Sequence, residues 1–169
     1  MARVFLLGSS SFIARAVVQA AKKRAIVCAA LPRGASLDRL MPTDSLINFA
    51  ITPAYRSSPY DEGQDCDLQA ARTAKAAGAW FGMMSTRRVY GPTARWGAQE
   101  DGQASGDETI YGCNKARTEA AIRELLPSRA GLFRLSNIIG YEYDEARLRN
   151  SFLGTLLFSL KKKDKSTLT

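Results

Sequence analysis

The chain contains no histidine among its 169 residues and only three cysteines. Without histidine, triads built around an imidazole base and most transition-metal sites are excluded. The cysteines, Cys28, Cys66 and Cys113, are an odd set without paired metal-ligand spacing, which favours reduced thiols over a disulfide framework. No N-terminal signal and no membrane-spanning apolar run is present. These absences predict a cytoplasmic protein that has no metal site and does not enter a membrane.

The composition is that of a globular domain, and its charge is strongly basic. Hydrophobic residues make up 46% of the chain and charged residues 24%, so one domain with a real core is expected. The formal net charge is +8, which attracts anionic ligands. Nucleic acid is the less favoured ligand, because no helix-turn-helix, zinc or aromatic stacking module is recognisable. Solvated lysines on helix surfaces explain most of the charge.

Apolar runs alternate with segments of helical periodicity along the chain. The patterns predict strands at 3–7, 25–30, 46–50, 79–85 and 131–136, and helices at 12–22, 65–77, 112–126 and 150–162. Asp65 and Asp67 at the start of the second helix, and Gly78 after it, are typical of helix ends. This alternation predicts an α/β fold whose parallel sheet is covered by helices on both faces.

A strand, a tight turn and a helix are expected at the N-terminus. The apolar run RVFLL ends at Gly8 and is followed by SSSFIARAVVQ, whose apolar residues recur at helical spacing. The free amides and dipole of a helix N-terminus favour a phosphate. Gly8, Ser11 and Ala14 would be the three small residues of the dinucleotide-binding fingerprint. Only the first is glycine, so an ordinary strand-to-helix turn is an equally good interpretation.

Tyr111 and Lys115 lie four residues apart on a predicted helix, and Thr86 ends the preceding strand in MSTRRVYG. Four residues are about one helical turn, so both side chains are directed toward the same small volume. A phenol is a poor acid or base at neutral pH, but a nearby ammonium favours the phenolate. Thr86 would add a neutral hydroxyl donor. The three residues predict a proton-relay site.

Five segments, taken in order, resemble the extended short-chain dehydrogenase/reductases, a family of nucleotide-sugar epimerases, dehydratases and reductases. They are GSSSFIA, LINFA, MSTRRVYG, YGCNK and FRLSNIIG. The resemblance implies a Rossmann-like doubly wound parallel sheet over residues 1–169. The sheet would be one strand short, because too few residues separate the second strand from LINFA. Most of the C-terminal substrate region would be lacking, with residues 138–169 the start of a truncated or incomplete substrate-binding region.

The resemblance also implies roles for individual residues. Tyr111 would exchange a proton with the substrate, Lys115 would hold the cofactor ribose, and Thr86 would bind the same substrate oxygen as Tyr111. Asn137 would contact the substrate. The remaining cofactor contacts would be Gly8, Ser11, Phe12, Ile13, Arg33, Ala50 and Ser136. The implied function is a nicotinamide-dependent oxidoreductase or epimerase acting on a nucleotide-linked sugar. The alternative is a non-catalytic dinucleotide-binding sensor or scaffold of the same fold.

Two further expectations concern subclass and cofactor. Sugar dehydratases of the family usually carry an Asp-Glu pair after the Thr; here Arg87 and Arg88 follow, so reductase or epimerase chemistry is favoured. NADP is preferred over NAD, because no acidic residue follows the second strand whereas Arg33 does, with Arg15 as a possible second cation.

The resemblance implies a homodimer packed through the helix after Ala50 and the helix bearing Tyr111. Small residues on these helices would permit close contacts between them: Ala70, Ala71, Ala74, Ala77, Ala116, Ala120 and Ala121. Packing within one chain explains the same alanines equally well.

Overall fold

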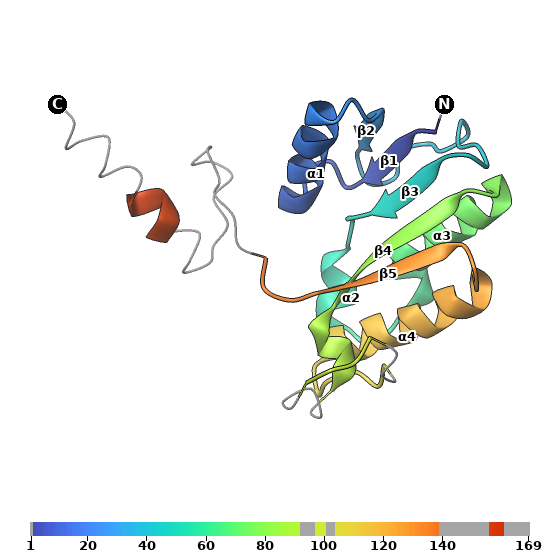
Figure 1. Ribbon diagram of the computed structural model, residues 1–169. Coiled ribbons are helices and arrows are strands. Elements are labelled where there is room, and N and C mark those ends of the chain that lie inside the picture. Colours follow the sequence, from blue (N-terminus) through green and yellow to red (C-terminus); the bar gives the residue numbers. More distant parts are fainter. Residues whose placement is uncertain (1, 92–96, 101–103, 139–155, 161–169) are drawn as a thin grey trace. The chain divides into compact units, whose positions relative to one another are not determined.

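The chain folds around a parallel sheet (Figure 1). A computed structural model describes residues 2–91, 97–100, 104–138 and 156–160, and divides the chain into two compact units, 1–135 and 136–169. In the first unit, a five-stranded sheet has the order β2-β1-β3-β4-β5, and every neighbouring pair is parallel. Its strands are β1 (Val4–Leu7), β2 (Cys28–Leu31), β3 (Ser45–Asn48), β4 (Trp80–Thr86) and β5 (Ala130–Leu135). The predicted α/β fold is confirmed.

The helices are α1 (Phe12–Lys23), α2 (Pro53–Ser57), α3 (Cys66–Ala77) and α4 (Ile110–Leu125), with 3-10 turns η1 (Glu62–Gln64) and η2 (Arg87–Tyr90). The sequence interpretation missed α2, since it predicted no helix there. Thr52 caps this helix by accepting a hydrogen bond from the Tyr55 amide, and Pro53 occupies its first turn. In the second unit, residues 156–160 are helical. The rest of the helix predicted at 150–162 lies outside the described residues.

The second strand begins later than predicted. The interpretation placed it at 25–30, but Ala25 has a φ of +53° and the Ile26 amide donates to the Ala21 carbonyl. These contacts extend the turn that ends α1, so the extended backbone starts only at Cys28. At α3, by contrast, the predicted end signals are confirmed: Asp65 caps the first turn, and Gly78 ends the helix with a φ of +67°.

The helices lie on opposite faces of the sheet. The β1-to-β2 connection moves across the sheet in one direction, whereas the β3-to-β4-to-β5 connections move in the other. Right-handed crossovers therefore place α1 on one face, next to β2, and α3 and α4 side by side on the other, against β3, β4 and β5 (Figure 1). The direction of winding reverses between β1 and β3, where ligands bind in doubly wound sheets.

The main core lies between the sheet and the α3–α4 layer. Leu46, Phe81 and Ile122 are fully buried there. Ala71 and Ala74 of α3 are also fully buried in this cluster. Packing within the chain therefore explains these two alanines, which had been offered as dimer contacts.

The expected shortening between the second and third strands is confirmed. Residues 32–44 are all described and contain turns but no strand, so β2 is an edge of the sheet.

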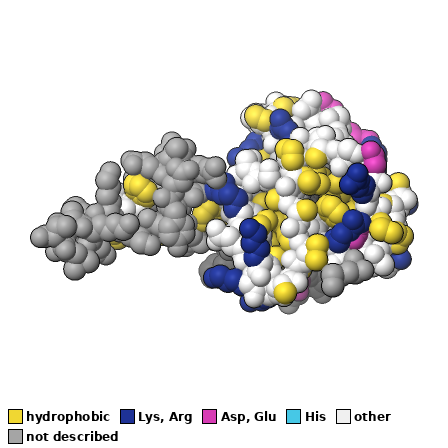
Figure 2. Space-filling model, turned by 90° about the horizontal axis from the view of Figure 1, so that it is seen from above, with side chains coloured by type: hydrophobic (Ala, Val, Ile, Leu, Met, Phe, Trp, Pro, Cys, Tyr) yellow, Lys and Arg dark blue, Asp and Glu magenta, His cyan; other side chains and the backbone are white. Residues whose placement is uncertain are grey.

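On the face seen in Figure 2, basic side chains are spread over the surface with apolar side chains between them. None of the described helices is long and apolar enough to cross a membrane.

Candidate active site

The loops that follow β1 and β3 touch at the point where the winding reverses. Gly8 has a φ of +90°, and a Cβ atom added to it would lie 2.8 Å from the Ala50 nitrogen. The backbone amides of Gly8 and Ser9 both donate to the Leu31 carbonyl at the end of β2. Gly8 is therefore required both by its backbone angle and by the close approach of the β3 loop. This contact holds the loops after β1 and β3 together at the carboxyl edge of the sheet.

The turn after β1 leads directly into α1. Ser11 occupies the N-cap position, and its amide closes the turn by donating to the Gly8 carbonyl at 2.9 Å. The Ser11 side chain makes no capping hydrogen bond. Since first-turn amides have no acceptor within a helix, the start of α1 suits a phosphate group. Ala14 is fully buried, as expected for close packing of this helix. The turn from Gly8 to Ser11 could hold the pyrophosphate of a dinucleotide.

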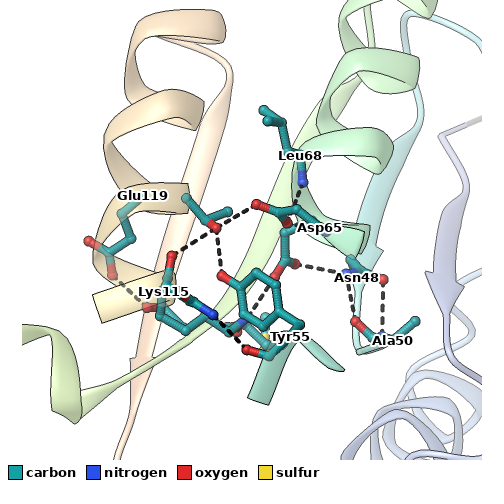
Figure 3. Close-up of polar contacts among 12 residues, drawn as sticks. Asn48, Ala50, Tyr55, Asp65, Leu68, Lys115 and Glu119 are labelled. Carbon is teal, nitrogen blue, oxygen red and sulfur yellow. Dashed lines mark hydrogen bonds and ion pairs between the residues drawn. The ribbon is translucent and has the colours of Figure 1, made fainter. Parts of the chain in front are cut away.

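Lys115 crosses from α4 to the carboxyl edge of the sheet and is almost fully buried there. Its Nζ donates to Asp67 Oδ2 at 2.5 Å and to the Met84 carbonyl at 2.9 Å. Figure 3 shows this side chain extending from α4 toward the start of α3. Burial works against the charge of Lys115, but Asp67, Tyr111 and Asp65 outweigh it and raise the pKa of Lys115 above its ordinary value.

The polar contacts of Lys115 continue as a chain to the loop after β3. Asp67 Oδ1 accepts a hydrogen bond from Asn48 Nδ2 at 2.8 Å. Asn48 in turn donates to the Ala50 carbonyl and accepts from the Ala50 amide, each at 3.0 Å (Figure 3). Lys115 and the Gly8–Ala50 contact are therefore connected through two buried side chains. Ala50, a predicted cofactor contact, belongs to this chain of hydrogen bonds.

The Tyr111 hydroxyl makes no hydrogen bond to the described residues, and the Thr86 hydroxyl accepts one but donates none to them. Tyr111 is half-buried in the first turn of α4, one turn before Lys115. Thr86 is half-buried at the end of β4, two residues after Met84. Its Oγ1 accepts a long hydrogen bond of 3.4 Å from the Arg88 amide, which leaves its proton to donate. Thr86 and Lys115 are thus linked to the same end of β4.

Comparisons with known proteins identify the fold that carries these residues. The chain superposes with a TM-score of 0.67 on dTDP-4-dehydrorhamnose reductase from Yersinia enterocolitica, at 15% identity, covering 96% of this chain and 61% of the other. UDP-N-acetylglucosamine 4-epimerase from Bacillus cereus gives 0.67 at 13% identity, covering 84% and 58%. A short-chain dehydrogenase/reductase superfamily protein from Agrobacterium tumefaciens, solved with bound NAD, gives 0.61 at 18% identity, covering 98% and 60%. The chain has the fold of the extended short-chain dehydrogenase/reductases.

This chain spans less than two thirds of the length of those three proteins. No family model matches the sequence, and no curated protein matches it. The likeness to the short-chain dehydrogenase/reductases thus resides in the arrangement of the sheet and helices.

Two polar residues near the short-chain dehydrogenase/reductase signature have structural partners. Asn114 Nδ2 donates to the carbonyls of Tyr55 and Ser58, so it fixes α2 to α4. Ser85 Oγ donates to Glu119 Oε1 at 2.5 Å, inside the α4–sheet interface. These hydrogen bonds give Ser85 and Asn114 a structural role.

The other predicted ligand contacts are dispersed. Phe12 and Ile13 are half-buried in the first turn of α1. Arg33 is exposed after β2, with Nη1 donating to the Ile51 carbonyl at 3.3 Å, which places it at the same edge as Ala50. Ser136 and Asn137 are exposed and belong to the second unit. Their nicotinamide and substrate contacts remain predictions.

Sequence reasoning missed Asn48 and recognised Asp67 only as a helix-start residue. Asn48 is buried in the middle of the apolar stretch LINFA, where a polar side chain needs a partner. That position was a usable signal. Asp67 lies in the pair Asp65–Asp67, of which Asp65 alone caps the helix, by accepting from the amides of Asp67 and Leu68. One capping residue is enough, so the second carboxylate was available for another role.

Proposed function

We propose that the full-length protein is a nicotinamide-dependent oxidoreductase or epimerase that acts on a nucleotide-linked sugar. The observation that carries this proposal is the position of Lys115, which is connected through Asp67 and Asn48 to Ala50 beside the Gly8 turn. Tyr111 and Thr86 add two available hydroxyl groups to the same region. Structural neighbours that are nucleotide-sugar reductases and epimerases support this reaction class.

Each of the three residues has a distinct proposed role. Tyr111 exchanges a proton with a substrate hydroxyl or carbonyl, and Thr86 donates a hydrogen bond to the same oxygen as charge develops on it. Lys115 binds the cofactor ribose. The nicotinamide ring, when bound, supplies or accepts the hydride. Asn137 contacts the substrate, and Ser136 helps to seat the nicotinamide.

Reductase or epimerase chemistry is favoured over dehydration. The positions after Thr86 hold Arg87 and Arg88, both exposed, and Arg88 is ion-paired with Asp107 at 3.1 Å. An arginine keeps its proton and cannot act as the base that dehydration requires.

The proposed cofactor is NADP, bound in preference to NAD. The Arg33 guanidinium lies at the carboxyl edge near Ile51, where it can pair with the additional phosphate.

We also propose that the protein is a cytoplasmic homodimer without nucleic-acid or membrane partners. Sedimentation of the full-length protein at micromolar concentration tests the dimer, and a clean monomer contradicts it.

The test of the function is turnover by the full-length protein and by Tyr111→Phe on a panel of nucleotide sugars with NADPH or NADP. Removal of the phenol oxygen is expected to lower turnover by about 10²-fold to 10⁴-fold, the usual contribution of a positioned acid or base. The control is Glu124→Gln, an exposed change on the same helix. Asn114→Asp would disturb the α2–α4 contact, and Arg117 lies over the Tyr60 ring, so neither position is used. Equal turnover by Tyr111→Phe and the unmodified protein would contradict the role of Tyr111.

A non-catalytic dinucleotide-binding sensor or scaffold is the second candidate. The pairing of Lys115 with Asp67 favours it, because the carboxylate neutralises the cation that was expected to assist Tyr111. Binding of NADPH without turnover of any sugar in the panel would support this candidate.

A further inference from the structure

The Lys115 ammonium has three N–H groups, and the described residues account for two of them. One N–H binds Asp67 Oδ2 and another binds the Met84 carbonyl. No other described residue accepts a hydrogen bond from Lys115. The side chain is only 4% exposed, so it is buried at the carboxyl edge of the sheet. A buried ammonium held by two partners has one donor left for a ligand.

The position of this third donor depends on Asp67. The Asp67 carboxylate is itself fixed, because Asn48 donates to its other oxygen and its backbone begins α3 directly after the Asp65 cap. Both oxygens therefore have assigned partners on different elements. When the acceptor cannot move, the ammonium that binds it cannot rotate freely. Asp67 thus sets the direction of the remaining N–H.

The groups that face Lys115 come from every element packed around it. Asp65 and Asp67 belong to α3, Tyr111 to α4 itself, and the Met84 carbonyl to β4. From α2, the Tyr55 ring lies with its centroid 5.5 Å from Nζ. Only Asp67 offers a charged oxygen that is bonded directly to the ammonium.

We propose that Asp67 is a positioning residue, which holds Lys115 so that its third N–H is directed to a hydroxyl of the cofactor ribose beside the nicotinamide. This inference rests on the proposed function and adds a residue to its site. The pair carries no net charge, so Lys115 acts toward the ribose as a hydrogen-bond donor. Through Asn48, the same carboxylate also connects this donor to the Ala50 loop.

The experiment measures NADPH binding by the full-length protein, through nucleotide fluorescence, together with its thermal unfolding. Asp67→Asn replaces the acceptor with an amide of the same shape and leaves Lys115 without its charged partner. The double variant Asp67→Asn/Lys115→Met removes the unpaired charge as well, so it remains testable if the single variant does not fold. Asp44→Asn is the matched control. Asp44, which precedes β3, is also a buried, ion-paired carboxylate, but its partner Arg3 lies at the opposite, amino edge of the sheet.

Asp67→Asn is expected to weaken NADPH binding by about tenfold to a hundredfold, the effect of losing one charge-assisted hydrogen bond. Binding of ADP, which lacks the nicotinamide half, should not change. The double variant should recover thermal stability relative to Asp67→Asn without recovering NADPH affinity. Asp44→Asn should lose stability and keep its NADPH affinity.

Two results would overturn the inference while leaving the proposed function intact. They are unchanged NADPH affinity in Asp67→Asn, and full NADPH affinity in the double variant, which would make the pair purely structural. Failure of the unmodified protein to bind NADPH or NADH would instead refute the proposed function, and the ribose role of the pair with it. That failure is distinguishable because it appears before any substitution is made.

Discussion

Two ion pairs at opposite edges of the same sheet differ in how far their side chains are exposed to water. At the amino edge, Arg3 before β1 binds Asp44 before β3 at 2.6 Å, and the Arg3 side chain is 33% exposed. At the carboxyl edge, Lys115 and Asp67 are each only 4% exposed. In the first pair Asp44 is buried and Arg3 is partly open to water, whereas both members of the second pair are buried.

The partners of the two pairs differ accordingly. Asp44 also accepts hydrogen bonds from the Arg3 and Met41 amides, and Arg3 donates to the Arg39 carbonyl. These contacts close the shortened connection between β2 and β3. The Nη1 donors of Arg3 also lack a described acceptor, but the Arg3 side chain is partly open to water, whereas the remaining donor of Lys115 is buried. The comparison shows that the carboxyl-edge pair leaves a buried donor without an acceptor among the described residues, whereas the unused donors of the amino-edge pair belong to a partly exposed side chain.

The largest expected effect is that of Lys115→Met, which leaves the Asp67 carboxylate buried without its cation. Loss of one partner from a buried pair typically costs about 3–5 kcal/mol of the free energy of unfolding. Urea denaturation at neutral pH measures the loss. The amino-edge control, Arg3→Met, should cost less, because Arg3 is partly exposed and Asp44 keeps two backbone donors. A greater loss of the free energy of unfolding in Arg3→Met than in Lys115→Met would show that the amino-edge pair, and not the buried carboxyl-edge pair, is the more important for stability.

Gly8→Ala is expected to lower the free energy of unfolding by about 2–4 kcal/mol, from left-handed backbone strain together with overlap of the β3 loop. Gly34 provides the control within the same edge. Its φ of +81° resembles the +90° of Gly8, but an added Cβ there would meet nothing within 4 Å. Gly34→Ala should therefore cost only the strain, about 1–2 kcal/mol. Equal costs, measured by urea denaturation, would show that the Gly8–Ala50 approach does not matter.

Arg33→Ala is expected to weaken NADP binding by about tenfold, the effect of losing one charge-assisted contact, and to leave NAD binding unchanged. Titration of both cofactors measures it. Arg39→Ala is the matched control, because Arg39 is an exposed arginine of the same connection whose carbonyl binds Arg3 at the amino edge. Tighter NAD than NADP binding by the unmodified protein would also reject the role of Arg33.

The smallest effect is confined to acid. Hydrogen bonding to Arg3 lowers the pKa of Asp44 to about 2. The ordinary aspartate value is about 3.9, so the ionised form stabilises the folded state above that pH, and this stability disappears as the pH falls toward about 2. The difference in urea midpoint between the unmodified protein and Asp44→Asn should therefore shrink between about pH 5 and about pH 2. A pH-independent difference would contradict this.

Local signals were sufficient to predict most elements of the fold. Each strand was found within a few residues because a short apolar run bounded by glycine, proline or charge has few alternatives. The ends of α3 were predicted from Asp65 and Gly78 because capping depends on neighbouring residues. The helix α2 was missed because five residues contain too little periodicity, although Thr52 and Pro53 are typical of a helix start.

By itself, the sequence determined which segments become strands and helices, and that Tyr111 and Lys115 share one face of α4, because those properties depend on residues a few positions apart. Only the tertiary structure decided which partner Lys115 takes. Asp67 is 48 residues from Lys115, and Asn48 is 19 residues from Asp67. A buried charge needs an oxygen partner, and the packing of distant helices and strands decides which oxygen is close enough. No spacing within a short stretch of sequence specifies that contact.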